Sequence, residues 1–255
     1  MVTFSEAQLM AWVAPIFWPF LRVLAVFASA PIFSARSVPM RTKIGLAFVI
    51  AICLQPALPT PSTLSLNSTA ALGAVIQQLS IGLAIGLAVR IVFSAIEMAG
   101  EIIGLQMGLN FAGFFDPSTN SQTSTVGRFF GNTSMLLFIV MNGYLLLIQA
   151  VAMSFETFPV SGEPLGAVRS LRLYELGGLI FYYGLWIALP MIGMLLFVNV
   201  VMGIISRIAP QMNVFAIGFP MTLSVGLLGI AFTLPMLDRP VMQLMRVVAD
   251  LFGVN

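Results

Sequence analysis

Histidine is absent from the 255-residue chain, and cysteine occurs once, as Cys53 within an apolar stretch. Without histidine there is neither a serine–histidine nucleophile pair nor a His-Glu-x-x-His zinc helix. A single cysteine excludes a disulfide within the chain and a multi-cysteine zinc site. The sequence also has no glycine-rich phosphate loop of the Walker type. We therefore predict that the protein is not an enzyme and holds no metal or cofactor.

Charge is scarce as well. Only 8% of the residues are charged and 59% are hydrophobic, whereas roughly 25% of the residues of an average soluble domain are charged. A helix of about 20 apolar residues crosses the hydrocarbon core of a bilayer, and the chain has four uncharged blocks of at least that length: Ile44 to Val89, Phe129 to Phe155, Leu176 to Ser206 and Ile208 to Leu237. Because helices of soluble proteins show only one apolar stripe, this pattern predicts an integral membrane protein. The small net charge of +2 argues against nucleic-acid binding.

The predicted fold class is all-α, built from membrane-embedded helical hairpins. Six apolar segments are expected, at about Gln8 to Ala30, Thr42 to Leu58, Ala70 to Val89, Phe129 to Phe155, Leu176 to Ser206 and Gln211 to Leu237. No basic region or small-residue cleavage site accompanies the first segment, so we expect a mature span there and not a removable signal.

Prolines interrupt several of these segments: Pro15, Pro19, Pro190, Pro210, Pro220 and Pro235. Each proline removes a helix hydrogen bond and bends or ends the helix. In lipid, the freed backbone groups need partners from protein or water. Two interpretations remain: ordinary kinks, or broken helices that pack against other chains.

Glycines recur on one predicted helix at Gly100, Gly104 and Gly108, and a shorter pair stands at Gly82 and Gly86. Small residues four apart form a smooth helix face that another helix can approach closely. The pattern is typical both of general helix packing and of a specific docking surface.

Three charged residues lie on the same predicted helix, Arg90, Glu97 and Glu101, at spacings of seven and four. Charges at membrane depth are costly, and they usually pair or line a water-filled space. Either an ion pair between Arg90 and Glu97 or polar contacts to a partner subunit would satisfy them. A proton relay is less well supported, because histidine and a second acidic helix are missing.

Phenylalanines cluster directly after this helix, in the segment from Gly108 to Pro117, which ends with the turn signal Asp116-Pro117. One interpretation is a helix end anchored at the membrane interface. The other is an apolar loop that obstructs a pore, because hydrophobic constrictions block ions and water by dewetting.

Three stretches resemble a known family: Ile205 to Pro220, Gly100 to Leu109, and Arg22 to Pro39 followed by Arg41 and Lys43. They are similar, in order, to the FliR family, the R subunit of the bacterial flagellar export gate, which has a counterpart in virulence-type type III secretion. Leu105-Gln106-Met107-Gly108 favours the flagellar branch.

The resemblance implies a protein-export channel in the bacterial inner (cytoplasmic) membrane, within the flagellar basal body. The expected partners are the P and Q subunits, the switch-type and large export-gate membrane subunits, membrane lipid, and the unfolded exported proteins that pass through. It further implies a P-like N-terminal part at residues 1–128, a helix and polar connector at 129–175, and a Q-like C-terminal hairpin at 176–255.

The resemblance also assigns residue roles. The pore plug is expected at Gly108, Phe111, Gly113, Phe114, Phe115, Asp116 and Pro117. Contacts to sister subunits are expected at Arg90, Glu97, Gly100, Glu101, Gly104, Arg207, Pro210, Gln211, Asn213, Gly218 and Pro220. The physical reason is that polar groups buried in an apolar assembly need partners. The competing hypothesis is a stand-alone secondary transporter of a small solute, because such proteins place broken helices and charges at their binding sites.

Overall fold

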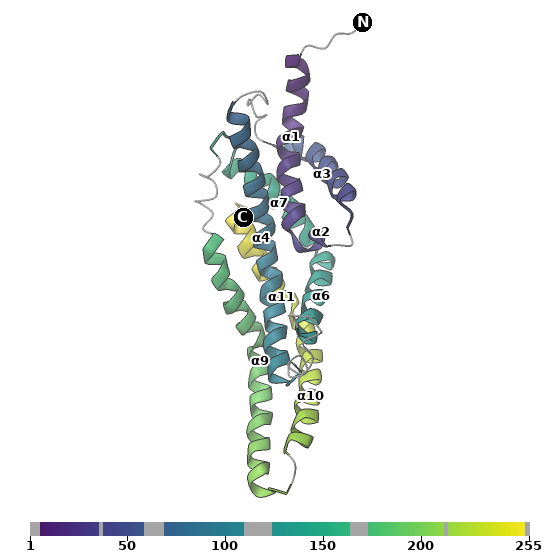
Figure 1. Ribbon diagram of the computed structural model, residues 1–255, viewed down its shortest axis with the longest axis vertical. Coiled ribbons are helices and arrows are strands. Elements are labelled where there is room, and N and C mark those ends of the chain that lie inside the picture. The colour runs from purple at the N-terminus through teal and green to yellow at the C-terminus, as the bar shows by residue number, and fades with distance from the viewer. Residues whose placement is uncertain are drawn as a thin grey trace. The chain divides into compact units, whose positions relative to one another are not determined.

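A computed structural model describes residues 6–35, 38–58, 69–109, 124–163, 173–211 and 214–252, and these ranges contain helices but no strand (Figure 1). The elements are α1 (Glu6–Ser29), α2 (Pro31–Ser34), α3 (Met40–Leu54), η1 (Gln55–Ala57), α4 (Thr69–Gln106), α6 (Thr125–Val140), α7 (Gly143–Thr157), α9 (Leu173–Ile208), α10 (Val214–Thr233), η2 (Leu234–Met236) and α11 (Asp238–Leu251). The predicted all-α class is confirmed.

Within the described ranges, five helical stretches are long and apolar enough to cross a membrane: Trp12–Ser29, Met40–Ala57, Ala70–Gln106, Leu176–Ile208 and Ala216–Met236. A sixth span results if the bent pair of α6 and α7 counts as one. These stretches correspond to the six apolar segments expected from the sequence. The third is longer than expected, because no proline interrupts α4 and the helix continues through its charged residues to Gln106.

The fourth apolar segment, Phe129 to Phe155, is not one straight helix but the pair α6 and α7, which is bent by 72°. The helix is interrupted at Met141 and Asn142, and Asn142 has a left-handed backbone with φ of 56°. Asparagine tolerates this conformation better than most residues. The local preference of the Asn142-Gly143 pair therefore breaks a stretch whose apolar composition alone predicts a single helix.

Four of the six prolines are accommodated inside helices. Pro15 and Pro19 lie in α1, Pro190 in α9 and Pro220 in α10, whereas Pro210 lies in a turn after α9 and Pro235 in η2. An internal proline removes one backbone hydrogen bond but does not end these helices.

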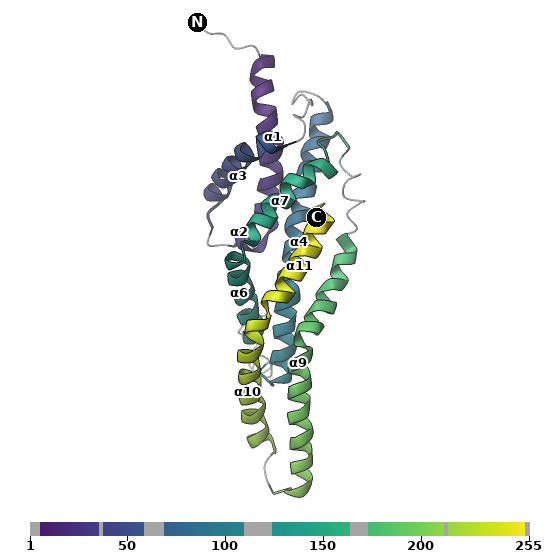
Figure 2. The ribbon, with the colours of Figure 1, turned by 180° about the vertical axis from the view of Figure 1, so that it is seen from behind.

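The chain divides into two compact units. Unit 1 consists of Met1–Ile91, Asn142–Leu176 and Met245–Asn255, and unit 2 of Val92–Met141 and Gly177–Leu244. The first unit contains α1, α3, α7 and the N-terminal half of α4 (Figure 2). Part of its core is formed by Trp18 of α1 with Ala71 and Ala74 of α4.

Helix α11 follows the last of the six apolar segments expected from the sequence. It carries buried Val241, Leu244 and Met245, while Arg239 and Arg246 are exposed. This spacing places the apolar residues on one helix face. The helix buries an apolar stripe although it is too polar to resemble a membrane span.

Candidate functional site

The segment predicted as a pore plug begins where α4 ends. Gly108 has a left-handed backbone with φ of 80°, the Leu109 N–H donates to the carbonyl of Gly104 at 3.1 Å, and the Gly108 N–H donates to that of Leu105 at 3.0 Å. Glycine in this conformation with both hydrogen bonds is a Schellman helix end. Phe111, Gly113, Phe114, Phe115, Asp116 and Pro117 lie outside the described residues.

At the other end of this segment, Ser124 begins α6. Its side-chain oxygen accepts a hydrogen bond from the Gly127 N–H at 2.9 Å, which caps the helix. Its own backbone N–H donates to Oε1 of Glu101 on α4 at 2.7 Å. A side chain of α4 is thus bonded directly to the first residue of α6.

The glycine face of α4 packs within the chain. A Cβ atom at Gly100 would lie 2.8 Å from both Cα of Gly127 and the carbonyl oxygen of Val126, and 3.0 Å from Cβ of Phe130. Gly104 is buried as well. The absence of a side chain at Gly100 therefore lets α4 and α6 approach closely. Contact of this face with a sister subunit stays a prediction.

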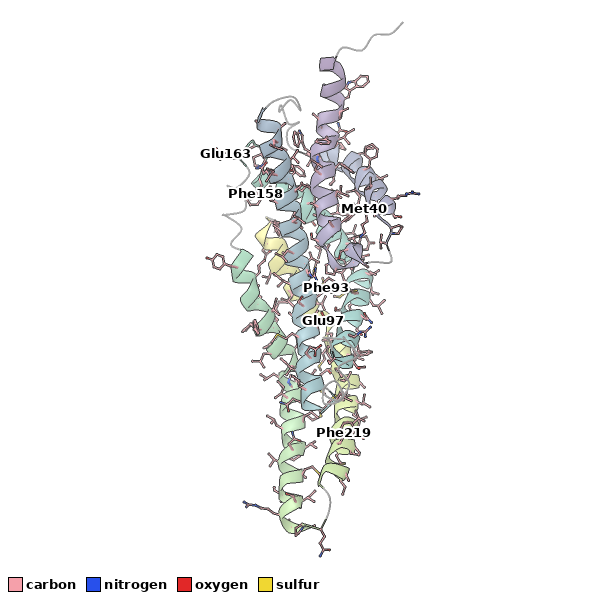
Figure 3. The ribbon with its side chains drawn as sticks, viewed as in Figure 1. Met40, Phe93, Glu97, Phe158, Glu163 and Phe219 are labelled. Atoms are coloured by element: carbon pink, nitrogen blue, oxygen red, sulfur yellow. The ribbon has the colours of Figure 1, made fainter. Side chains whose placement is uncertain are left out.

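The remaining charged residues of α4 differ in exposure. Arg90 is exposed and Glu97 is half-buried, and both Glu97 and Phe93 project from α4 (Figure 3). A Cβ atom at Gly131 of α6 would lie 3.8 Å from the carboxyl carbon of Glu97. Phe93 packs against Phe138 of α6, with ring centroids 5.6 Å apart. The two interpretations of Arg90 and Glu97 stay open.

The motif around the turn between α9 and α10 is largely exposed. Arg207 in the last turn of α9, Pro210 and Gln211 in the following turn, and Pro220 in α10 are exposed. A cation near a helix C-terminus is favoured by the helix dipole. Gly218 is half-buried, and Asn213 lies outside the described residues.

Helix α10 meets α4 and α9 through glycines that face methionines. A Cβ atom at Gly226 would lie 2.5 Å from Cγ of Met107, and one at Gly229 would touch Met191. The Thr222 hydroxyl is 3.4 Å from the carbonyl oxygen of Met107, to which it donates. The last turn of α4 therefore packs into α10. Met191 was not among the residues singled out in the sequence, and Met107 appeared there only within a family motif.

Unit 1 also contains a buried cation that was not predicted from the sequence. Arg22 is 0% exposed. Its Nε donates to Oε1 of Gln78 at 2.8 Å, one terminal nitrogen donates to Oγ of Ser154 at 2.8 Å, and the other donates to the carbonyl of Phe158 at 2.9 Å. The guanidinium lies 3.5 Å from the ring centroid of Phe155. Arg22 thus joins α1 to α4 and to the end of α7.

The hydrogen-bond network continues from Gln78 to the segment after α7. Nε2 of Gln78 donates to Oε1 of Gln77 at 3.1 Å, and Nε2 of Gln77 donates to Oγ of Ser161 at 2.9 Å. The Ser161 N–H donates back to Oε1 of Gln77 at 2.9 Å. A signal was present in the sequence, because Arg22 is the only charged residue between Ala7 and Ala35.

The two C-terminal apolar helices leave most of their surface uncovered within the chain. Only 33% of the span window Leu176–Ile208 and 22% of Ala216–Met236 is buried. Large side chains such as Phe197 and Phe232 are 70% and 76% exposed. An apolar surface of this extent requires lipid or protein partners.

These features define a polytopic helical membrane protein. Among the described residues, no group of three or more His, Cys, Asp or Glu side chains could hold a metal ion. Residues 13–248 match the model of bacterial export proteins, family 1, and the chain belongs to this family. The resemblance noted in the sequence is therefore confirmed.

Individual relatives agree along nearly the whole chain. The flagellar biosynthetic protein FliR of Pectobacterium carotovorum subsp. carotovorum is 42% identical over 253 residues, covering 99% of this chain and 97% of the relative. FliR of Escherichia coli (strain K12) is 43% identical over 237 residues, covering 93% and 90%. FliR of Bacillus subtilis (strain 168) is 29% identical over 212 residues, covering 81% and 80%. These names describe flagellar biosynthesis and not a chemical reaction.

Proposed function

We propose that the chain is a structural and gating subunit of the protein-export channel of the flagellar type III secretion apparatus. The observation that carries this proposal is its similarity to flagellar biosynthetic FliR proteins along nearly the whole chain. The family of bacterial export proteins supports a role in moving proteins across a membrane. Its place is the bacterial inner membrane, in the flagellar basal body.

The segment from Gly108 to Pro117 closes the pore in this proposal. Its three phenylalanines, Phe111, Phe114 and Phe115, supply an apolar constriction that excludes water and ions. Support comes from the ends of the segment, because the chain leaves α4 through a defined helix cap at Gly108 and enters α6 at Ser124, which is bonded to α4.

The P and Q subunits are the proposed neighbours, followed by the switch-type and large export-gate membrane subunits. The exposed apolar surfaces of α9 and α10 support this part, because they need covering. At the exposed turn after α9, Arg207 and Gln211 are proposed to make polar contacts to these neighbours. Unfolded exported proteins pass through the channel that the subunits enclose.

Deletion of Ala112 to Phe115 tests the plug. In the assembled complex, the deletion is expected to raise ion conductance across the membrane in the absence of export, because the apolar constriction is lost. Replacing the three phenylalanines by leucine is the matched control, since leucine keeps the segment apolar and is expected to leak less than the deletion. An unchanged ion barrier in an assembled deletion complex would contradict the proposal.

A stand-alone solute transporter is the second candidate, and the buried polar cluster around Arg22 is the observation that favours it. That cluster is bonded to groups of the same chain, including Gln78 and Ser154. Co-purification followed by mass measurement of the intact complex separates the two functions. A chain that is stable only with partners supports the export gate, whereas solute binding by the isolated chain supports the transporter.

A further inference from the structure

Helix α3 packs on α1 through a narrow face. This face carries its buried residues, Ala47, Ala51 and Leu54, which recur at the spacing of one side of a helix. Phe48 also contacts Phe20 of α1, with ring centroids 6.3 Å apart. Only 17% of the apolar stretch Met40–Ala57 is buried. Most of the surface of α3 is therefore not covered by the chain itself.

The uncovered side of α3 is apolar. Met40 projects from the start of the helix and is 56% exposed (Figure 3). Further large apolar side chains along the helix have exposed fractions of 41% to 55%: Ile44, Leu46, Phe48, Val49 and Ile52. The 18 residues of Met40–Ala57 extend about 27 Å at 1.5 Å per residue, which is close to the thickness of a hydrocarbon core. Acyl chains can therefore cover α3 along its whole length.

Two basic residues occupy the first turn of α3. Arg41 is exposed and Lys43 is half-buried, and this turn contains no acidic residue. The sequence has no acidic residue at all between Glu6 and Glu97. A positive charge at the start of a helix is disfavoured by the helix dipole, so the two cations do not serve to stabilise α3. An anion from outside the chain would compensate them.

We propose that the start of α3 binds the headgroup of an anionic phospholipid, whose acyl chains lie along the exposed apolar side of the helix. The lipid phosphate receives charge-assisted hydrogen bonds from Arg41 and Lys43. An anionic phospholipid carries negative charge at one end and apolar chains beyond it, in the same order in which α3 presents basic and apolar side chains. A zwitterionic phospholipid has the same acyl chains without net charge, so it binds this site more weakly.

Charge variants in the first turn test the headgroup contact. R41Q/K43Q removes both charges and keeps polar side chains, whereas Arg41→Lys keeps the charge. Gly45 lies one helical turn after Arg41, and nothing lies within 4 Å of the position that a Cβ atom there would take. Gly45→Arg can therefore be added to R41Q/K43Q to restore a positive charge on the same side. Arg239→Gln removes an exposed arginine of α11 and is the control.

The measurement is the quenching of a fluorophore on α3 by brominated phospholipids, in the assembled complex with cysteine-free sister subunits. Cys53 is replaced by serine, and the fluorophore is attached at Val49→Cys on the exposed apolar side, about 12 Å along the helix from Arg41. Mixtures of brominated and unbrominated phosphatidylglycerol and phosphatidylcholine give the relative affinity of the two lipids next to the label.

Phosphatidylglycerol is expected to bind more tightly than phosphatidylcholine at low salt. Each basic residue removed is expected to lower this preference about fivefold, the effect of one basic residue near an anionic membrane surface. Gly45→Arg is expected to restore about fivefold of the loss in R41Q/K43Q, and Arg41→Lys and Arg239→Gln are expected to keep the preference. Added salt is expected to reduce it, because exposed charges are screened.

Several outcomes would overturn the site. A label that neither lipid quenches would show that protein covers α3 in the complex. Equal affinity of the unchanged protein for both lipids would exclude headgroup selection without any variant, so the test does not depend on assembly of R41Q/K43Q. Loss of a sister subunit from R41Q/K43Q, with the lipid preference unchanged, would assign the basic pair to a protein contact. These measurements do not involve ion conductance, so they are independent of the proposed pore plug.

Discussion

The Nε of Arg22 donates a 2.8 Å hydrogen bond to Oε1 of Gln78, and so joins the middle of α1 to the first half of α4. Arg22 is completely buried and also donates to Ser154 and to the carbonyl of Phe158. A guanidinium satisfies several acceptors at once because its donors form a rigid planar fork. Arg22 therefore holds three parts of unit 1 together.

Replacing Arg22 by methionine is expected to destabilise the protein by about 3 kcal/mol, because several buried acceptors lose their donor. Arg22→Lys is expected to recover only part of this loss, since an ammonium lacks the fork geometry. The measurement is the free energy of unfolding in detergent. Arg90→Met removes an exposed arginine and is the control, with an expected change within about 0.5 kcal/mol. Equal stability of the two methionine variants would contradict the role of Arg22.

Gly82→Ala is expected to weaken the packing of α4 on α1. The new Cβ would collide with the carbonyl oxygen of Arg22 and lie 2.7 Å from Cβ of Ala25. Because a backbone carbonyl cannot rotate away, the helices must separate, at a cost of about 1 to 3 kcal/mol.

Gly45→Ala is the control for Gly82→Ala, because nothing lies within 4 Å of the position that a Cβ atom at Gly45 in α3 would take. It is expected to be neutral, or to stabilise the protein by up to about 1 kcal/mol through helix propensity. Thermal unfolding of both variants in detergent tests the difference. A Gly82 variant as stable as the Gly45 variant would show that α1 and α4 are not in close contact.

Composition predicted the spans because hydrophobicity extends over each whole segment, and a bilayer requires no finer pattern. The glycine spacing at Gly82 and Gly100 predicted smooth helix faces, but it could not identify which helix covers each face. Gly82 faces α1 and Gly100 faces α6. The partner of a face depends on contacts between residues distant in sequence, and spacing along one helix does not determine these contacts.

Some of the residues at the candidate site could be predicted from the sequence, and others could not. The family motif directed attention to the end of α4, where the structure describes the cap at Gly108 and the bond of Glu101. It did not single out Arg22 as a buried residue, although an isolated charge in an apolar segment is itself a signal. The break at Asn142 was missed because hydropathy does not report backbone conformation.

Substitutions at Asn142 test that break. A φ of 56° is sterically unfavourable for alanine and for residues branched at Cβ. Asn142→Ala is therefore expected to destabilise the protein by about 1 kcal/mol. Asn142→Gly should be close to neutral, because glycine adopts this conformation readily. Unfolding in detergent is the measurement.

The same substitutions remove the exposed 3.0 Å hydrogen bond that the Tyr144 hydroxyl donates to Oδ1 of Asn142. Tyr144→Phe measures that loss separately and is expected to have a small effect, because the hydrogen bond is exposed. If Asn142→Ala and Asn142→Gly were equally stable, backbone conformation would not be what selects asparagine at this position.

The contact between Met107 and Gly226 permits a test of the packing of α4 on α10. A Cβ atom at Gly226 would lie 2.5 to 2.6 Å from three atoms of the Met107 side chain, and Met107 is completely buried. Gly226→Ala therefore forces a flexible side chain to move, at an expected cost of about 1 kcal/mol. Met107→Ala leaves a cavity and is expected to cost about 2 to 4 kcal/mol.

In the double variant M107A/G226A, the added methyl group occupies part of the space that the methionine has left. Its destabilisation is therefore expected to fall below the sum of the two single changes by about 1 kcal/mol, as residues in direct contact show in double-mutant cycles. Gly193→Ala is the control on α9, because nothing lies within 4 Å of its Cβ position. Combined with Met107→Ala, it should give additive free energies of unfolding. Additivity in the Gly226 cycle as well would mean that the end of α4 does not rest on α10.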